Sequence, residues 1–184
     1  MHAAPVAAPG PKQWPALSPE NAEYLHVTVT GHFLAGRDTL VRATTELGGG
    51  YWVMAPLQAD AGFVVLINRG FVTPEQTHYA SPETGSRVTV TGLLRMTEKG
   101  GGFLRKNAPG QERWYSRDVA AIAHSRQISM VSPYFIDAQA SPRPPPVGGL
   151  TVVAFRNTHL SYAFTWVALA AMCVAAGVRA TLDR

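Results

Sequence analysis

The amino-acid sequence predicts a mainly β (α+β) protein: a small antiparallel β-barrel-like domain with one short helix, followed by a C-terminal transmembrane helix. Three observations support this prediction. Several short segments alternate apolar and polar residues with a period of two, which is typical of half-buried strands. Glycine-rich breaks separate these segments. Near the C-terminus, the nineteen residues from Leu160 to Val178 carry no charge.

Changes in composition divide the chain of 184 residues into four parts. Residues 1–23 are rich in proline and alanine, which predicts an extended segment with Trp14 as its one large anchor. This segment has neither the basic region nor the apolar core of a secretory signal. Residues 24–156 form the predicted soluble β domain, residues 157–179 the membrane helix and residues 180–184 a short tail.

Four strands are predicted in the first half of the β domain. Turns with glycine lie at 36–38 and 60–62, and a glycine triplet at 48–50 is expected to break the chain. The last of the four strands contains Phe-Val-Val-Leu-Ile, a continuous apolar run that is typical of a central strand covered on both faces. The strands are expected at residues 24–33, 39–45, 51–57 and 63–68.

The second half of the domain repeats a phrase from the first. Val-Thr-Val-Thr-Gly occurs at 27–31 and again at 88–92, inside a predicted fifth strand. Two equivalent strand–hairpin units would suit a small antiparallel barrel. The alternative, that the same strand-forming residues arose twice independently, explains the repetition equally well. The remaining expected elements are a loop at 74–85 with a helical turn at 75–79, strands at 87–95, 113–116, 134–138 and 151–155, a helix at 119–124 capped by Ser116 or Asp118, and a stiff proline-rich linker at 141–149.

The uncharged run from Leu160 to Val178 would be about 28 Å long as a helix, which matches the hydrocarbon core of a bilayer. A helix buried in a small domain is expected to carry a charged face, and this run has none. Tyr162 and Trp166 lie near one end of the run, as interfacial aromatic residues do. We therefore expect a protein anchored in a membrane.

The sequence argues against several functional classes. Cys173 is the single cysteine, so the chain has no thiol pair for a copper chaperone or a thioredoxin-like protein. The formal charge of +4 comes from scattered arginines without basic–aromatic alternation, which argues against nucleic acid as a partner. The glycine triplets are not followed by Lys-Ser or Lys-Thr, and hydrolase motifs are absent, so enzymatic activity is not expected.

The first candidate site lies at the start of the predicted membrane helix. His159, Tyr162 and Trp166 fall on one face of that helix. An imidazole beside two aromatic rings would suit a planar apolar cofactor whose metal needs an axial nitrogen. Hydrogen bonding to lipid headgroups is the alternative role for the histidine.

The second candidate site is formed by Asn68, Arg69 and Gly70, which follow the most apolar strand. A charged, glycine-containing corner of this kind suits the binding of a protein partner. The alternative is a strand terminus in which Gly70 adopts a special backbone conformation and Arg69 pairs with a nearby carboxylate.

Six phrases of the sequence resemble the surfeit locus protein one family, also called the Shy family, of cytochrome c oxidase assembly factors. They occur in family order and cover about residues 24–175, which makes the resemblance specific. The phrases are Thr-Glu-Leu-Gly-Gly-Gly-Tyr-Trp-Val (45–53), Val-Leu-Ile-Asn-Arg-Gly-Phe-Val (65–72), Val-Thr-Gly-Leu-Leu-Arg (90–95), Trp-Tyr-Ser-Arg-Asp (114–118), Pro-Tyr-Phe-Ile-Asp (133–137) and Asn-Thr-His-Leu-Ser-Tyr-Ala-Phe-Thr-Trp (157–166).

The resemblance implies a non-enzymatic protein of the bacterial inner membrane, with a periplasmic soluble domain, that helps haem a reach the largest subunit of cytochrome c oxidase. It also implies that His159 is the candidate ligand of haem a. Family members are multi-pass proteins with a first transmembrane helix before the soluble domain, and this sequence is expected to begin after that helix.

A second function hypothesis involves no cofactor. In it, the protein is a membrane-tethered interaction scaffold that binds an oxidase subunit, and Asn68, Arg69 and Gly70 matter more than His159. Both hypotheses leave open a homo-oligomer.

Overall fold

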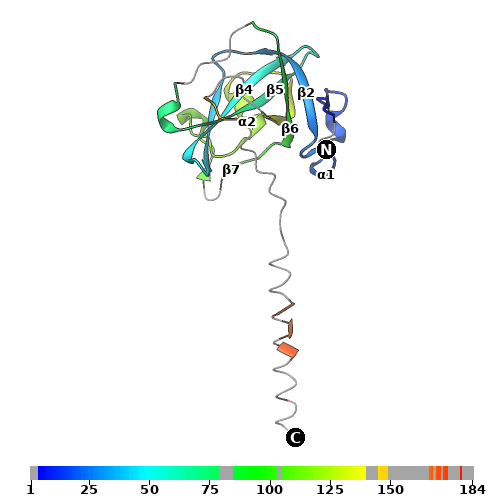
Figure 1. Ribbon diagram of the computed structural model, residues 1–184, viewed down its shortest axis with the longest axis vertical. Helices are drawn as coiled ribbons and strands as arrows, with labels where there is room; N and C mark the ends of the chain where they lie inside the picture. Colours follow the sequence, from blue (N-terminus) through cyan, green and yellow to red (C-terminus); the bar gives the residue numbers. More distant parts are fainter. Residues whose placement is uncertain are drawn as a thin grey trace. The chain divides into compact units, whose positions relative to one another are not determined.

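The computed structural model consists of two compact units, Met1–Thr151 and Val152–Arg184. Figure 1 traces the chain through its strands and helices in the colours of the sequence. The structure describes residues 4–78, 85–102, 105–139, 145–148, 166–167, 169–170, 172–173 and 179.

The first unit contains a β-barrel. Its main sheet has the strand order β1-β2-β6-β9-β5-β4-β3, and a further pairing of β2 with β4 closes the strands between them into a ring. β7 and β8 pair with each other in a separate two-stranded sheet. The strands are β1 (Val6–Ala7), β2 (His26–Phe33), β3 (Thr39–Thr45), β4 (Gly48–Ala59), β5 (Val64–Val72), β6 (Val88–Met96), β7 (Gly101–Gly102), β8 (Arg105–Lys106) and β9 (Val131–Ala138).

Short helices connect the strands. Before α2, the Asp118 side chain accepts a hydrogen bond of 3.1 Å from the Ala121 amide, which confirms the predicted helix and one of its two predicted caps. The other helices are single turns of three or four residues. The helices are α1 (Pro19–Ala22), α2 (Val119–Ser125) and the 3-10 helices η1 (Trp14–Ala16), η2 (Pro74–Gln76) and η3 (Pro109–Gln111).

The prediction of a mainly β, barrel-like domain with a short helix is confirmed. The prediction of an antiparallel arrangement is only partly right, because β5 pairs in parallel with β9 and β1 pairs in parallel with β2. Alternation along a strand reports which face is buried but not the direction of the neighbouring strand. The direction of the β5–β9 pairing therefore depends on the path that the chain takes through β6 and α2.

Two predictions about the strands are wrong. The glycine triplet does not break the chain but begins β4, where Gly48, Gly49 and Gly50 pair with the end of β3. A Cβ atom on Gly50 would lie 2.3 Å from the Val72 carbonyl oxygen, so glycine allows β5 to pack against this position. The segment predicted as a strand at 113–116 forms only isolated bridges, from Arg113 to Ala108 and from Trp114 to Val41.

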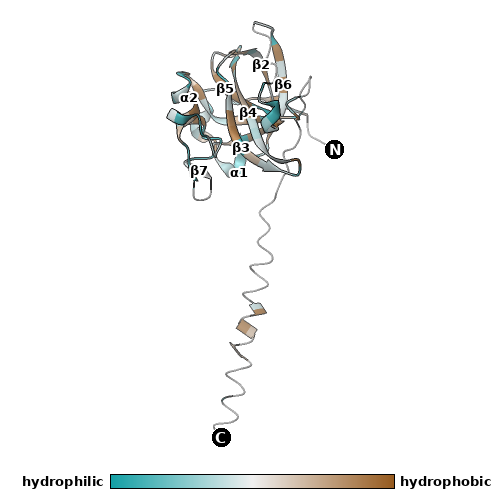
Figure 2. Ribbon diagram, turned by 90° about the vertical axis from the view of Figure 1, so that its left-hand side faces the viewer, coloured by the Kyte–Doolittle hydropathy of each residue, from teal (hydrophilic) through white to brown (hydrophobic). Residues whose placement is uncertain are grey.

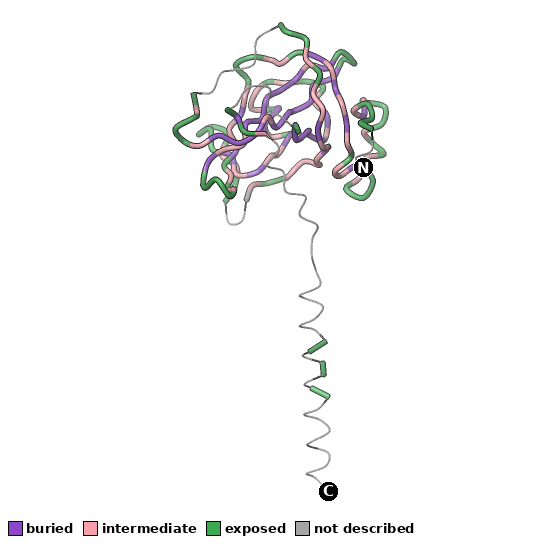
Figure 3. Tube along the Cα trace, in the orientation of Figure 1, coloured by how far each residue is buried: buried purple, intermediate pink, exposed green. Residues whose placement is uncertain are grey.

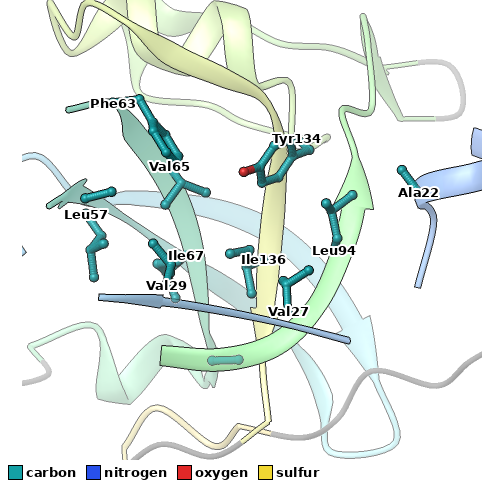
Figure 4. Close-up of a cluster of buried hydrophobic side chains, with 12 residues drawn as sticks. Ala22, Val27, Val29, Leu57, Phe63, Val65, Ile67, Leu94, Tyr134 and Ile136 are labelled. Carbon is teal, nitrogen blue, oxygen red and sulfur yellow. The ribbon is translucent and has the colours of Figure 1, made fainter. Parts of the chain in front are cut away.

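The apolar run of β5 is buried on both faces, as predicted. Val65 and Ile67 point into the barrel, where Figure 4 shows them among residues such as Leu94 and Ile136. Leu66 belongs to a second cluster outside the barrel, in which Trp114 and residues of α2 cover the other face of the sheet. The uninterrupted hydrophobicity of this strand therefore follows from its two buried faces.

The distribution of burial matches this layered core. Figure 3 shows buried chain along the strands of the barrel and exposed chain at the turns. Figure 2 shows hydrophobic residues along β4 and β5. Apolar clusters cover both faces of these two strands, so their side chains are shielded from water on both sides.

The stretch before Tyr24, which the composition predicts to be extended, contains two helical turns in addition to β1. Trp14 packs edge-on against Phe63, with ring centroids 5.7 Å apart. The buried Tyr134 hydroxyl donates a hydrogen bond of 2.7 Å to the Pro9 carbonyl oxygen, and burial raises the pKa of this phenol above its ordinary value. These contacts attach the N-terminal segment to the interior of the barrel.

The second unit is described at residues 166–167, 169–170, 172–173 and 179, and all of them are helical. Among the residues that the structure describes, no helix is long and apolar enough to cross a membrane. The rest of the predicted transmembrane helix lies outside the described residues, as does the strand predicted at 151–155. The transmembrane helix therefore stays a prediction.

Candidate functional site

A buried carboxylate lies near the end of β9. The side chain of Asp137 is only 2% exposed, and its neighbours in register are Asn68 on β5 and Leu93 on β6. An ionised carboxylate is expensive to bury unless donors and opposite charges compensate for the lost water. The surroundings of Asp137 therefore have to supply both.

Three side chains from three parts of the chain donate to Asp137. Asn68 Nδ2 lies 2.8 Å from Oδ1, Arg117 Nη1 lies 3.3 Å from the same oxygen, and Arg95 Nη1 lies 3.3 Å from Oδ2. One carboxylate thus links β5, β6, β9 and the segment that leads into α2. We call these residues, with Glu23 and Glu98, the Asp137 cluster.

Each of the two arginines of the cluster has a second carboxylate partner. Arg95 Nε donates to Glu23 at 2.6 Å, and the guanidinium of Arg117 donates to both carboxylate oxygens of Glu98. The arginines also lie over aromatic rings, as expected for partly buried guanidinium groups. The distance to the ring centroid is 4.7 Å from Arg95 to Tyr24 and 4.6 Å from Arg117 to Phe135.

Pairing keeps Glu98 and Arg95 charged at neutral pH. Burial raises the pKa of Glu98, but the hydrogen bonds and the charge of Arg117 outweigh it and bring the pKa below its ordinary value. Burial lowers the pKa of Arg95, but Glu23 and Asp137 raise it above its ordinary value. Charged groups held in this way are suited to fastening strands together rather than to transferring protons.

The segment predicted as a partner-binding corner is part of β5, so the strand does not end before it. Asn68 and Gly70 are buried, and Arg69 is half-buried with its guanidinium 5.6 Å from the centroid of the Phe33 ring. Asn68 bridges two groups: its Nδ2 donates to Asp137, and its Oδ1 accepts a hydrogen bond of 3.1 Å from the Gly70 amide. The partner-binding role of these three residues stays a prediction.

Gly70 lets another segment of the chain approach β5. Its φ is +129°, and a Cβ atom would lie 2.4 Å from the carbonyl oxygen of Val147. The next residue, Phe71, exchanges two backbone hydrogen bonds of 2.9 Å with Val147. Asn68 and Gly70 therefore join the Asp137 cluster to the point where residues 145–148 attach to the barrel.

Sequence reasoning missed the charged members of the Asp137 cluster. For two of them the signal is a single charge near the end of a strand: Arg95 lies one residue before the end of β6, and Asp137 lies one residue before the end of β9. Pairing these charges requires knowledge of which strands are neighbours, since Arg95 and Asp137 are 42 positions apart.

The predicted cofactor site is described only at Trp166, which is helical and 65% exposed. His159 and Tyr162 lie outside the described residues. Val167, Leu169 and Met172 are also exposed, so the described turns of this helix present an apolar surface. Among the residues described, no group of three or more histidine, cysteine or acidic residues could hold a metal ion.

Comparison with known proteins decides the family. Residues 1–171 match the SURF1 family. The chain belongs to the SURF1 family. The match confirms the resemblance found in the six phrases, and it covers every member of the Asp137 cluster together with His159, Tyr162 and Trp166.

Curated members of the SURF1 family are similar over most of this chain. Surfeit locus protein 1 of Mus musculus is 32% identical over 187 residues, covering 90% of this chain and 60% of the mouse protein. The human Surfeit locus protein 1 is 32% identical over 188 residues, covering 90% and 62%. A SURF1-like protein of Monosiga brevicollis is 36% identical over 171 residues, covering 83% and 64%. The chain thus spans less than two thirds of the length of these SURF1 relatives.

Proposed function

We propose that this protein is a membrane-bound assembly factor for cytochrome c oxidase that assists the insertion of haem a into the largest oxidase subunit. The observation that carries the proposal is the SURF1 match over residues 1–171, which includes both the barrel and the segment with His159. The Asp137 cluster supports it, because a barrel fastened by buried ion pairs is a rigid platform for a partner.

The proposed cofactor role belongs to His159, Tyr162 and Trp166. The described part of this segment fits an apolar macrocycle. Trp166 and Leu169 are helical and exposed, and the two residues between them in the sequence are uncharged. In the proposal, His159 would supply a neutral imidazole nitrogen to the haem, and the two aromatic residues would offer apolar surface to it. When bound, the haem would supply the iron that this imidazole coordinates.

Haem binding can be tested with the full chain purified in detergent from a host that makes haem a. We expect a Soret band that weakens in His159→Ala. His124→Ala is the matched control, because His124 is an exposed histidine at the end of α2. An unchanged Soret band in His159→Ala would remove this histidine from the proposal.

The alternative function is a cofactor-free scaffold for an oxidase subunit. The position of Arg69 favours it: among the three residues predicted to bind a partner, Arg69 is the one that is not buried. In this case the haem-free protein should co-purify with the oxidase subunit, and Arg69→Ala should abolish this while His159→Ala preserves it. Arg87→Ala is the matched control, since Arg87 is an exposed arginine elsewhere on the barrel.

We further propose that the barrel lies in the periplasm and that residues 157–179 cross the bacterial inner membrane. The uncharged run in the sequence supports the membrane span, and the resemblance to the family implies the periplasmic side. Fusion of alkaline phosphatase to the turn at Gly62, an exposed position between β4 and β5, tests it. An active fusion is expected, and an inactive but stable fusion would contradict the periplasmic location.

A further inference from the structure

A groove of about 430 Å³ lies beside β3, the strand at one end of the main sheet. Arg42 and Thr44 of β3, Tyr51 of β4, and Arg105 and Tyr115 line it. Its volume falls in the range of small-molecule sites. None of these residues belongs to the Asp137 cluster or to the predicted haem and partner sites.

The groove is positively charged. Arg42 and Arg105 are both exposed, and none of the described residues that line the groove is acidic. Within the described part of the chain, neither arginine has an ion-pair partner. The contrast with other arginines of the barrel is clear, since carboxylates pair with Arg87, Arg95, Arg117 and Arg126.

Two tyrosines accompany the two arginines. Arg42 is the direct cross-strand neighbour of Tyr51. The guanidinium of Arg105 lies 5.6 Å from the centroid of the Tyr115 ring. Both tyrosines are half-buried, so each has a supported ring and an accessible surface. The groove thus combines two cationic groups with two aromatic surfaces.

Hydrogen bonds fix the wall of the groove. The Arg42 amide donates to the Trp114 carbonyl oxygen at 2.8 Å, and Asn107 Oδ1 accepts from the Tyr115 amide at 2.8 Å. Amide groups two residues apart on a strand point to the same side, so Thr44 presents its N–H at the same edge as Arg42. A site with fixed donors loses less conformational entropy when a ligand binds.

We propose that this groove binds an organic phosphate monoester, with the phosphate held by Arg42 and Arg105 and the organic part resting on Tyr51 and Tyr115. Guanidinium groups match phosphate oxygens in charge and in geometry. A dianionic phosphate compensates both positive charges, whereas a single carboxylate compensates one. The proposal goes beyond the assembly function, because it depends on neither haem nor the oxidase.

A phosphate monoester can come from a soluble metabolite or from the headgroup of a phosphatidate lipid. Binding to the detergent-purified full chain can be measured by isothermal titration calorimetry with phenyl phosphate, inorganic phosphate and dihexanoyl phosphatidate, with dihexanoyl phosphatidylcholine as the lipid control. Tighter binding of phenyl phosphate indicates the soluble source. Tighter binding of the phosphatidate, with no binding of the phosphatidylcholine, indicates the lipid source.

Variants test the assignment of the residues. Arg42→Gln and Arg105→Gln should each weaken phosphate binding by roughly tenfold or more, as expected for loss of a charged hydrogen-bonding partner. Arg87→Gln is the control for a change in surface charge and should leave affinity unchanged. Tyr115→Leu should weaken binding of phenyl phosphate more than binding of inorganic phosphate.

Two results would overturn the proposal. The first is the absence of saturable binding of all three phosphate probes to the wild-type chain. The second is binding that neither Arg42→Gln nor Arg105→Gln weakens. Because both arginines are exposed, the variants should fold as the wild type does, which circular dichroism and thermal unfolding can verify.

Discussion

The side-chain amide of Asn68 on β5 donates a hydrogen bond of 2.8 Å to the buried carboxylate of Asp137 on β9, the strand that pairs with β5 in parallel. Two positions 69 residues apart in the sequence thus meet at the centre of a charged cluster. The same amide group also accepts from Gly70, so Asn68 connects the cluster to the backbone of its own strand.

Replacement of Asn68 should therefore destabilise the barrel. Asn68→Ala removes a donor to Asp137 and an acceptor for Gly70, and we expect a loss of roughly 1–3 kcal/mol in the free energy of unfolding. Asn68→Asp should cost more, because it keeps the acceptor but places a second carboxylate against Asp137. Urea unfolding of both variants measures the difference, and an Asn68→Asp variant as stable as the wild type would contradict this account.

The ion pairs of Asp137 should matter more than an ion pair on the surface. Asp137→Ala leaves Arg95 and Arg117 without their shared buried partner, and we expect a loss of about 3 kcal/mol or more in the free energy of unfolding. In the matched variant Asp60→Ala, only the exposed pair with Arg87 is lost, with an expected cost below about 1 kcal/mol. Equal losses in the two variants would show that burial does not make the ion pairs of Asp137 more important for the free energy of unfolding.

Substitution of Gly70 should loosen the attachment of residues 145–148. Gly70→Ala introduces a Cβ atom 2.4 Å from the Val147 carbonyl oxygen, so one of the two segments has to move. We expect faster amide hydrogen exchange at Phe71 and Val147, whose amides bond to each other's carbonyl groups. Gly48→Ala is the control, because Gly48 also has a positive φ but open space around it. If both variants changed exchange equally, backbone strain rather than close approach would explain the effect.

Glu98 should make the stability of the protein depend on pH. Its pKa in the folded protein lies below the ordinary value, so its contribution is fully present above about pH 4.3, the unfolded value, and is lost as the pH falls through the folded pKa. Glu98→Gln should be less stable than the wild type at pH 7. The difference between the two proteins should shrink as the pH falls below about 4.3, and urea unfolding from pH 7 to pH 3 measures it. A constant difference over this range would exclude the titration of Glu98 as its cause.

Local patterns determined much of the barrel. The alternation in β2 and β6, the apolar run of β5 and the cap of α2 are properties of short segments, and each was predicted from the sequence. They are readable because burial of one face, burial of two faces and capping of a helix each require a particular residue type at a fixed spacing. The family also follows from short phrases, and comparison with known proteins confirms it.

The tertiary structure alone decided which strands are neighbours, and with this the candidate sites. The parallel pairing of β5 with β9 brings Asn68 to Asp137, and the position of β3 beside Trp114 opens the groove at Arg42. Each of these contacts joins segments far apart in the chain, so no local spacing encodes it. Gly70 shows the difference most clearly: its glycine predicted an unusual backbone conformation, but only the fold shows that Val147 occupies the space beside it.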